Sequence, residues 1–69
     1  MKYVICETMT AIVLHIREGS FEPCGKQSTM TLCDTKPAWD TKIPVDAVKN
    51  GEGRWCRMCT KIYFGRVVA

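Results

Sequence analysis

Residues 55–59 read Trp-Cys-Arg-Met-Cys, and this stretch decides the fold of the 69-residue chain. Two cysteines with two residues between them bring both sulfurs to one side of a tight turn, where a tetrahedral zinc ion can bind them as thiolates. The same spacing occurs in redox pairs, but those lie at the start of a helix in a βαβ context. No long helical pattern follows Cys59. We therefore predict that Cys56 and Cys59 supply half of a four-ligand zinc site.

The length of the chain makes a metal useful. A domain of this size buries only about 60% of the surface that its unfolded chain exposes, so disulfides, a metal or self-association must add to a marginal core. The chain has five cysteines. No secretory signal is recognisable, and in the cytoplasm thiols stay reduced and favour metals over disulfides. We expect a single cytoplasmic zinc-stabilised domain over residues 1–69, with no membrane span.

β-Branched residues mark the first half of the chain. Residues 2–6 (Lys-Tyr-Val-Ile-Cys) and 11–17 (Ala-Ile-Val-Leu-His-Ile-Arg) are typical of short strands. Glycine, proline and serine make residues 18–28 a loop. Residues 29–33 alternate apolar and polar side chains again. We predict that they return antiparallel to residues 11–17 and form a hairpin with a long tip.

The second half carries fewer regular signals. Pro44 at the start of residues 44–48 and Gly51 just after them predict one short helical turn. Over residues 54–64 we predict the turn that carries the cysteines, followed by a closing strand. The expected fold class is a small β-rich zinc-binding domain with zinc-ribbon-like antiparallel hairpins and at most one short helix.

A structural zinc site has four protein ligands, so two more must be found. The candidates are His15, Cys24, Cys33 and Cys6. In the predicted hairpin His15 lies roughly opposite Thr31 and within reach of Cys33. The preferred ligand set is His15, Cys33, Cys56 and Cys59.

The competing set replaces His15 with Cys24. In a regular hairpin Cys24 lies at the tip, more than about 10 Å from Cys33 at about 3.3 Å per residue. However, a glycine after a ligand cysteine suits a tight turn around the metal, and Gly25 follows Cys24. His15 would then be an ordinary packing residue, so the fourth ligand stays open between the two. Cys6 is interpreted as a small buried apolar side chain.

Short motifs in the chain follow a recognisable order. They are His15, Thr31-Leu32-Cys33, Trp39-Asp40 and Trp55-Cys56-Arg57-Met58-Cys59. Together they resemble small zinc-ribbon-like proteins of bacteria and their phages, in which a strand histidine precedes a Thr-Leu-Cys-Gly turn and a terminal C-x-x-C. The resemblance covers roughly residues 13–62 and departs from the family pattern at Asp34, where the family has glycine. It implies a zinc-bound β-rich fold and no particular activity.

Catalysis at the zinc is disfavoured, because four protein ligands leave no open position for water or substrate. The single histidine is itself a candidate ligand. The chain has no nucleophile elbow, no phosphate-binding glycine loop and no H-E-x-x-H motif. We therefore expect a non-catalytic module.

The charge distribution indicates where a partner would bind. The net charge is +3, and residues 49–69 hold five Lys or Arg against one Glu. The predicted partner-binding residues there are Arg54, Arg57, Lys61 and Arg66. Interleaved aromatic rings could stack on bases, but +3 is low for a dedicated nucleic-acid binder. We expect a regulator or inhibitor that binds a larger protein and is phage-related, with a nucleic-acid-binding zinc ribbon as the alternative.

Overall fold

Residues 2–9, 12–22, 29–49 and 52–68 are described by the structure, a computed structural model. In chain order the elements are β1 (Tyr3–Glu7), β2 (Leu14–Glu18), β3 (Trp39–Asp40), a 3-10 turn η1 (Val45–Ala47) and α1 (Arg57–Val68). The strands form one antiparallel sheet in the order β2-β1-β3. The expected small β-rich domain with one short α-helix is confirmed.

The strand predicted over residues 2–6 is present as β1, and the one predicted over residues 11–17 is present as β2 from Leu14 onward, while residue 11 lies outside the described residues. They pair from Tyr3 opposite Glu18 to Glu7 opposite Leu14, and this register sets Cys6 opposite His15. Successive side chains of a strand point to opposite faces, and directly opposite residues share a face. His15 therefore lies on the face that also carries Cys6.

The prediction of a strand over residues 29–33 is wrong. This segment makes a single antiparallel bridge, between Thr31 and Arg17, and the strand that pairs with β2 along its length is β1. The residue opposite Thr31 is therefore Arg17, two residues after His15, which was expected in that position. A full strand cannot form here, because residues 54–56 occupy the rest of the same β2 edge through hydrogen bonds to Leu14.

The closing strand expected within residues 54–64 is also wrong, because this part of the chain enters the 12-residue helix α1. Ile62, Tyr63 and Phe64 favour strands, and Gly65 weakens a helix. Apolar and polar residues do not alternate with helical periodicity. The helix is held instead by tertiary contacts and by its N-terminal cap, which propensity does not register.

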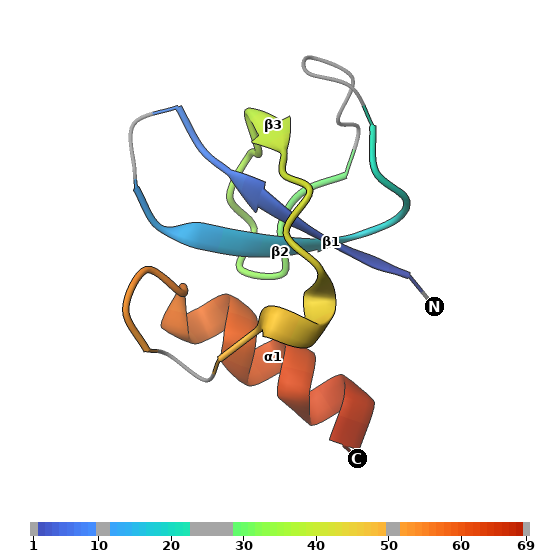
Figure 1. The fold of residues 1–69 in the computed structure, drawn as a ribbon, viewed down its shortest axis with the longest axis vertical. Helices are drawn as coiled ribbons and strands as arrows, with labels where there is room; N and C mark the ends of the chain where they lie inside the picture. The colour runs from blue at the N-terminus through green and yellow to red at the C-terminus, as the bar shows by residue number, and fades with distance from the viewer. Residues whose placement is uncertain (1, 10–11, 23–28, 50–51, 69) are drawn as a thin grey trace.

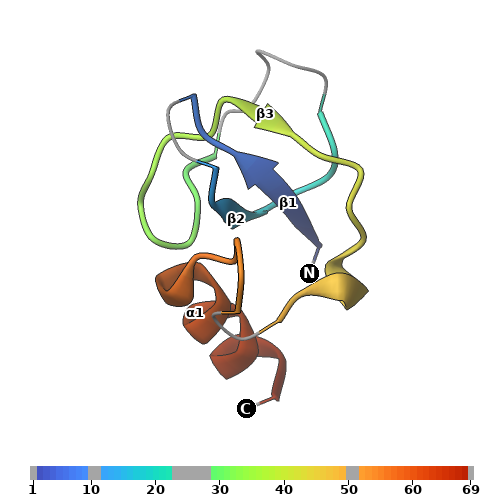
Figure 2. The same cartoon turned by 60° about the vertical axis from the view of Figure 1, so that its left-hand side comes forward.

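α1 lies against one face of the sheet, as Figures 1 and 2 show from two directions. Cys59 packs in the core with Ile5, Leu14 and Ile16. Further along the helix, the rings of Tyr63 and Tyr3 meet edge to face, with their centroids 5.1 Å apart. The helix is thus fixed to the sheet at its first turn and near its middle. Among the described residues no helix is long and apolar enough to cross a bilayer.

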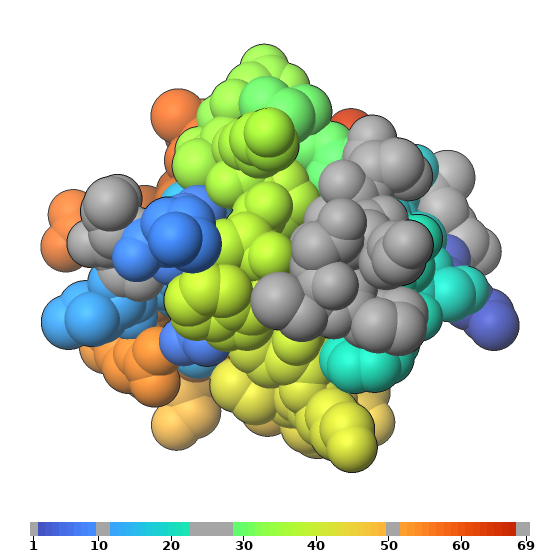
Figure 3. All heavy atoms as spheres, turned by 90° about the horizontal axis from the view of Figure 1, so that it is seen from above, coloured from blue at the N-terminus to red at the C-terminus, as the bar shows by residue number. Residues whose placement is uncertain are grey.

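The segment that leads through β3 lies on the side of β1 and β2 away from α1, as Figure 1 shows. Seen from above in Figure 3, residues 29–46 form a band between the end of β1 and residues 20–22. The short helical turn predicted over residues 44–48 is present as η1, with Pro44 as its N-cap.

A buried ion pair joins this band to the sheet. Arg17 is 1% exposed, and its Nε and Nη2 donate to the two carboxylate oxygens of Asp40 at 2.9 and 2.5 Å. The same guanidinium donates to the backbone oxygens of Glu18 and Ser20, both at 2.8 Å, and to Glu22 Oε1 at 3.3 Å. Arg17 therefore ties β2, β3 and the chain after β2 together.

Candidate metal centre

The site forms on the outer edge of β2, where two distant segments meet. The first is residues 54–56: Leu14 N–H donates to Arg54 O at 2.6 Å, and Cys56 N–H donates to Leu14 O at 2.9 Å. The second segment, which carries Cys33, joins two residues further along β2. There Leu32 N–H donates to the oxygen of Ile16 at 2.8 Å. His15 lies between the two docking points.

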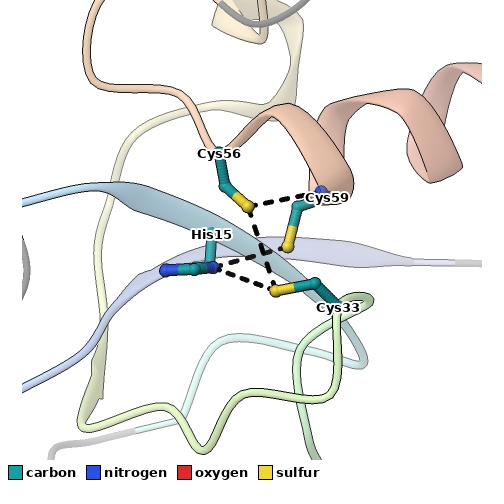
Figure 4. A group of neighbouring side chains, drawn as sticks. All are labelled: His15, Cys33, Cys56 and Cys59. Carbon is teal, nitrogen blue, oxygen red and sulfur yellow. Dashed lines mark hydrogen bonds between the residues drawn. The ribbon is translucent and has the colours of Figure 1, made fainter.

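Four side chains converge at this junction: His15, Cys33, Cys56 and Cys59. Their donor atoms all lie within 4.8 Å of one another, so the group can hold a metal ion. Figure 4 shows the three sulfurs and the ring nitrogen facing a common centre. The structure thus brings together the four residues of the preferred set. Cys24 of the competing set lies outside the described residues.

The distances fit a tetrahedral metal. His15 Nδ1 lies 3.4 Å from Cys33 Sγ and 3.5 Å from Cys59 Sγ, and the sulfurs of Cys33 and Cys56 are 3.9 Å apart. Zinc bonds of about 2.3 Å to sulfur and 2.0–2.1 Å to nitrogen, at tetrahedral angles, require about 3.6 Å between nitrogen and sulfur and about 3.8 Å between sulfurs. No donor has to move far to bind such an ion.

Cys56 also caps helix α1. It immediately precedes the first helical residue, and its Sγ accepts the backbone N–H of Cys59 at 3.4 Å. This is the bond that a Ser or Asp oxygen makes at an N-cap. A thiolate suits the position because the N-terminus of a helix favours negative charge. The C-x-x-C pair therefore starts a helix, contrary to the sequence-based expectation, although no parallel βαβ unit is found among the described elements.

Cys33 lies in a tight turn over residues 31–35. Thr31 N–H donates to Thr35 O, and Asp34 N–H donates to Thr31 O, both at 2.9 Å. Asp34 has a φ of 62°, in the left-handed region that glycine adopts without strain and aspartate tolerates better than most residues. Asp34 can therefore occupy this turn position with little strain.

Two threonine hydroxyls contact the sulfur of Cys33. Thr31 Oγ1 lies 3.3 Å and Thr35 Oγ1 3.2 Å from Cys33 Sγ. Burial acts to raise the pKa of this thiol. Hydrogen bonds from the two threonines, Cys59 and His15 outweigh burial and lower the pKa to about 6. Cys33 is thereby prepared as a thiolate, the form that binds metal.

The pKa of the Cys59 thiol is shifted in the opposite direction from that of Cys33. Its side chain is completely buried, and burial, with a contribution from the neighbouring Cys33, raises its pKa to about 12. Closely spaced thiols cannot all ionise without a cation. A divalent ion would supply that charge and release the proton of Cys59, so metal binding at this site is coupled to proton release.

Cys6 takes no part in the cluster. It is fully buried, and burial together with the charge of Asp40 raises its pKa to about 12. The interpretation of Cys6 as a small buried apolar side chain fits this environment. The thiol stays protonated in the sheet.

The four residues predicted to bind a partner fall into two pairs. Arg54 donates to Ile12 O at 2.7 Å and to Glu7 Oε2 at 2.6 Å, and Arg66 forms an ion pair with Glu18. Both arginines therefore hold parts of the domain together. Arg57 and Lys61 are exposed one helical turn apart on α1, and they are the members of the set that remain available for a partner.

Sequence reasoning missed two features of this region. It did not identify the Arg17–Asp40 pair, since a charged residue in a strand is usually exposed. It also did not assign a role to the hydroxyl of Thr35. A signal was present in the spacing Thr-x-Cys-x-Thr at residues 31–35, which puts a hydroxyl two residues to either side of a ligand cysteine.

Comparisons of this chain with protein-family models, with curated proteins and with solved structures found no match.

Proposed function

We propose that His15, Cys33, Cys56 and Cys59 bind one Zn²⁺ ion that stabilises the fold. The observation that carries this proposal is the convergence of one nitrogen and three sulfurs within 4.8 Å of one another. Thiolates and imidazole in this geometry are the preferred zinc ligands, whereas harder ions prefer oxygen. Such an ion would join β2, the turn over residues 31–35 and the start of α1.

The proposed zinc has a structural role and not a catalytic one. All four donors come from the protein, which leaves no position for water or substrate. His15 and Cys59 are 7% and 0% exposed, so substrate cannot reach the ion from their side. The domain is therefore proposed as a non-catalytic module.

The zinc proposal is tested by native mass spectrometry of the reduced protein, with one zinc per chain as the expected result. Substitution by Co²⁺ should give the absorption spectrum of a tetrahedral site with three sulfur ligands. A folded, metal-free monomer would contradict the proposal.

Single substitutions of the candidate residues distinguish His15 from Cys24 as the fourth ligand. Loss of a ligand opens the site and removes folding energy, so His15→Ala should lose the zinc. Cys24→Ser and Cys6→Ser should keep it. If Cys24→Ser comes out metal-free while His15→Ala stays loaded, the ligand set is wrong.

We further propose that the module binds a larger protein through a groove away from the metal centre. The groove has a volume of about 670 Å³ and is lined by the start of β1, residues 19–21, residues 41–46 and the second half of α1. Phe21 and Val67 on its walls are 50% and 49% exposed. Exposed apolar surface of this kind marks interaction sites. Lys2 and Lys42 also line it with one carboxylate, Asp46, and this excess of positive charge favours an apolar segment with acidic neighbours.

A nucleic-acid partner is the second candidate, supported by the exposed Arg57 and Lys61 on α1. Phosphate contacts carry affinity without reading sequence and make binding fall steeply with salt. The two candidate partners therefore predict different effects of the same substitutions. Phe21→Glu should abolish binding to a protein partner and spare nucleic acid, whereas Arg57→Glu should weaken nucleic acid of any sequence and leave the protein complex intact. Failure of labelled RNA or DNA to bind at low salt would eliminate the second candidate.

A further inference from the structure

The three sulfurs of the metal centre differ in their exposure. Cys59 is 0% exposed and packs among Ile5, Leu14 and Ile16, while Cys33 and Cys56 are half-buried. The two half-buried sulfurs are 3.9 Å apart. They belong to the two separate segments that dock on the edge of β2, as Figure 4 shows. An oxidant from solvent therefore reaches Cys33 and Cys56 before Cys59.

We propose that Cys33 and Cys56 form a peroxide-modification site within the metal centre. This inference rests on the proposed zinc ion, which holds both side chains as thiolates. Hydrogen peroxide takes two electrons from the pair, one from each sulfur. Its O–O bond breaks, an S–S bond forms between Cys33 and Cys56, and two protons from solvent complete two molecules of water. The zinc loses two of its four ligands and leaves as Zn²⁺.

The geometry selects this pair over the neighbours in sequence. A disulfide needs a sulfur–sulfur distance of about 2.05 Å, so the sulfurs of Cys33 and Cys56, which are 3.9 Å apart, must approach by about 2 Å. A disulfide between Cys56 and Cys59 would need the sulfur of Cys59, which is 0% exposed and which an oxidant from solvent reaches last.

The consequence is a change in what holds the junction together. The metal joins three parts of the chain, whereas the disulfide joins only the turn over residues 31–35 to the start of α1. His15 and Cys59 are then left as two donors, too few to retain zinc in a closed site. Peroxide therefore converts the domain from a zinc-held to a disulfide-held form.

The test uses zinc-loaded full-length protein and one equivalent of hydrogen peroxide. The zinc content is measured first, so that a metal-free preparation is counted against the proposed function and not against this inference. A chromophoric chelator then reports the released zinc, with one ion per disulfide as the expected result. Retention of zinc while peroxide is consumed would overturn the inference.

The chain provides a direct way to map the disulfide. Trypsin cleaves after Arg57, between the two cysteines of the C-x-x-C pair, and the Cys33 peptide spans residues 27–42. The expected product links residues 27–42 to residues 55–57. A link between residues 55–57 and 58–61 would instead show that the C-x-x-C pair is oxidised, and would overturn the choice of pair.

Variants separate the pair from the other thiols. Cys6→Ser and Cys24→Ser should release zinc as the unmodified protein does. Cys33→His keeps four nitrogen or sulfur donors but leaves Cys56 without its partner. If this variant loads zinc, it should release at least tenfold less zinc in the same time. Equal release would show that Cys33 is not required for the loss of zinc. If the variant does not load zinc, the peptide map of the unmodified chain still identifies which cysteines form the disulfide.

Discussion

His15 and Arg17 are two buried polar residues on the same face of β2, and they reach stability in different ways. Arg17 finds its partners within the chain: Asp40, two backbone oxygens and Glu22. Every buried side-chain nitrogen or oxygen in the described part has a hydrogen-bond partner. His15 faces three cysteine sulfurs, of which two are within 3.5 Å. Sulfur is a weak hydrogen-bonding atom, and under the proposed function a zinc ion would complete the surroundings of His15.

The comparison shows how a small domain can stabilise two regions of one strand with different chemistry. At Arg17 the ion pair is internal, so folding requires only the chain. At His15 the proposed zinc ion would supply much of the energy that docks α1, because metal binding is folding energy in such sites. We call the region around His15 and the three cysteines the metal end, and the region around Arg17 and Asp40 the Arg17 end. The stabilities of these two regions should respond differently to chelators, acid and mutation.

The largest effect is expected from Cys59→Ser, which removes a buried ligand. Structural zinc contributes about 10–16 kcal/mol in zinc-finger peptides, as much as the whole stability of a typical domain. The variant should be unfolded and metal-free, and a chelator should produce the same state in the unmodified protein. Circular dichroism and zinc content measure both. A folded Cys59→Ser variant would mean that the metal end, like the Arg17 end, folds without a metal ion.

The next effect is expected from Arg17→Met, which leaves Asp40 buried without its cation. Breaking a buried pair in this way costs about 3–5 kcal/mol. Because the metal ligands are untouched, folded molecules should still bind one zinc, and added zinc should raise the melting temperature. Calorimetry with and without zinc measures this.

The double variant Arg17→Met/Asp40→Leu is the control for this pair. Replacing both charges by apolar side chains removes the unpaired charge, so the double variant should be more stable than Arg17→Met alone. A double variant that is less stable than either single variant would show that the contacts of Arg17 to backbone oxygens matter more than its pairing with Asp40.

The sequence predicted the metal end better than the Arg17 end. The C-x-x-C spacing and the single histidine limited the choice of ligands, because few residue types bind zinc. The partners of Arg17 could not be predicted, since Asp40 lies 23 residues away and any exposed carboxylate would have matched equally well. Long-range pairs of this kind depend on the register of the sheet and leave no local pattern.

The helix was missed for a related physical reason. Strand-favouring residues at 62–64 agree with a strand, and tertiary contacts such as that between Tyr63 and Tyr3, together with the sulfur cap at Cys56, select the helix. Intrinsic propensity is a weak guide that such contacts override. At residues 29–33 tertiary structure prevents a strand that the local pattern favours. Its alternation suits a strand, but the edge of β2 that it would need is shared with residues 54–56.

A smaller effect at the Arg17 end is expected from Gly19→Ala. Gly19 has a φ of 119°, and a Cβ there would lie 2.7 Å from Arg17 Nη1. The strained backbone alone costs on the order of 1–3 kcal/mol. The variant should melt at a lower temperature, with its zinc content unchanged. Ser20→Ala, an exposed neighbour, is the control. Equal stability of both variants would indicate that the guanidinium moves aside freely.

The smallest effect is expected at the metal end, from Thr35→Val, which keeps the shape of the side chain and removes the hydroxyl next to Cys33 Sγ. In the fold the pKa of Cys33 is lowered to about 6 from its ordinary 9.0. Its thiolate therefore contributes stability that is present above the ordinary pKa and is lost as the pH falls through about 6. Without the hydroxyl the pKa rises and protons compete better with zinc.

Zinc release during acidification should therefore start at a higher pH in Thr35→Val than in the unmodified protein. The expected shift is at most about one pH unit, which corresponds to about 1.4 kcal/mol and to the lower end of the effects that residues behind metal ligands produce. A pH titration with a fixed chelator concentration measures the shift. Thr29→Val, an exposed change outside the turn, is the control. If both variants release zinc at the same pH, the hydroxyl of Thr35 does not stabilise the thiolate, and the metal end depends on its four donors alone.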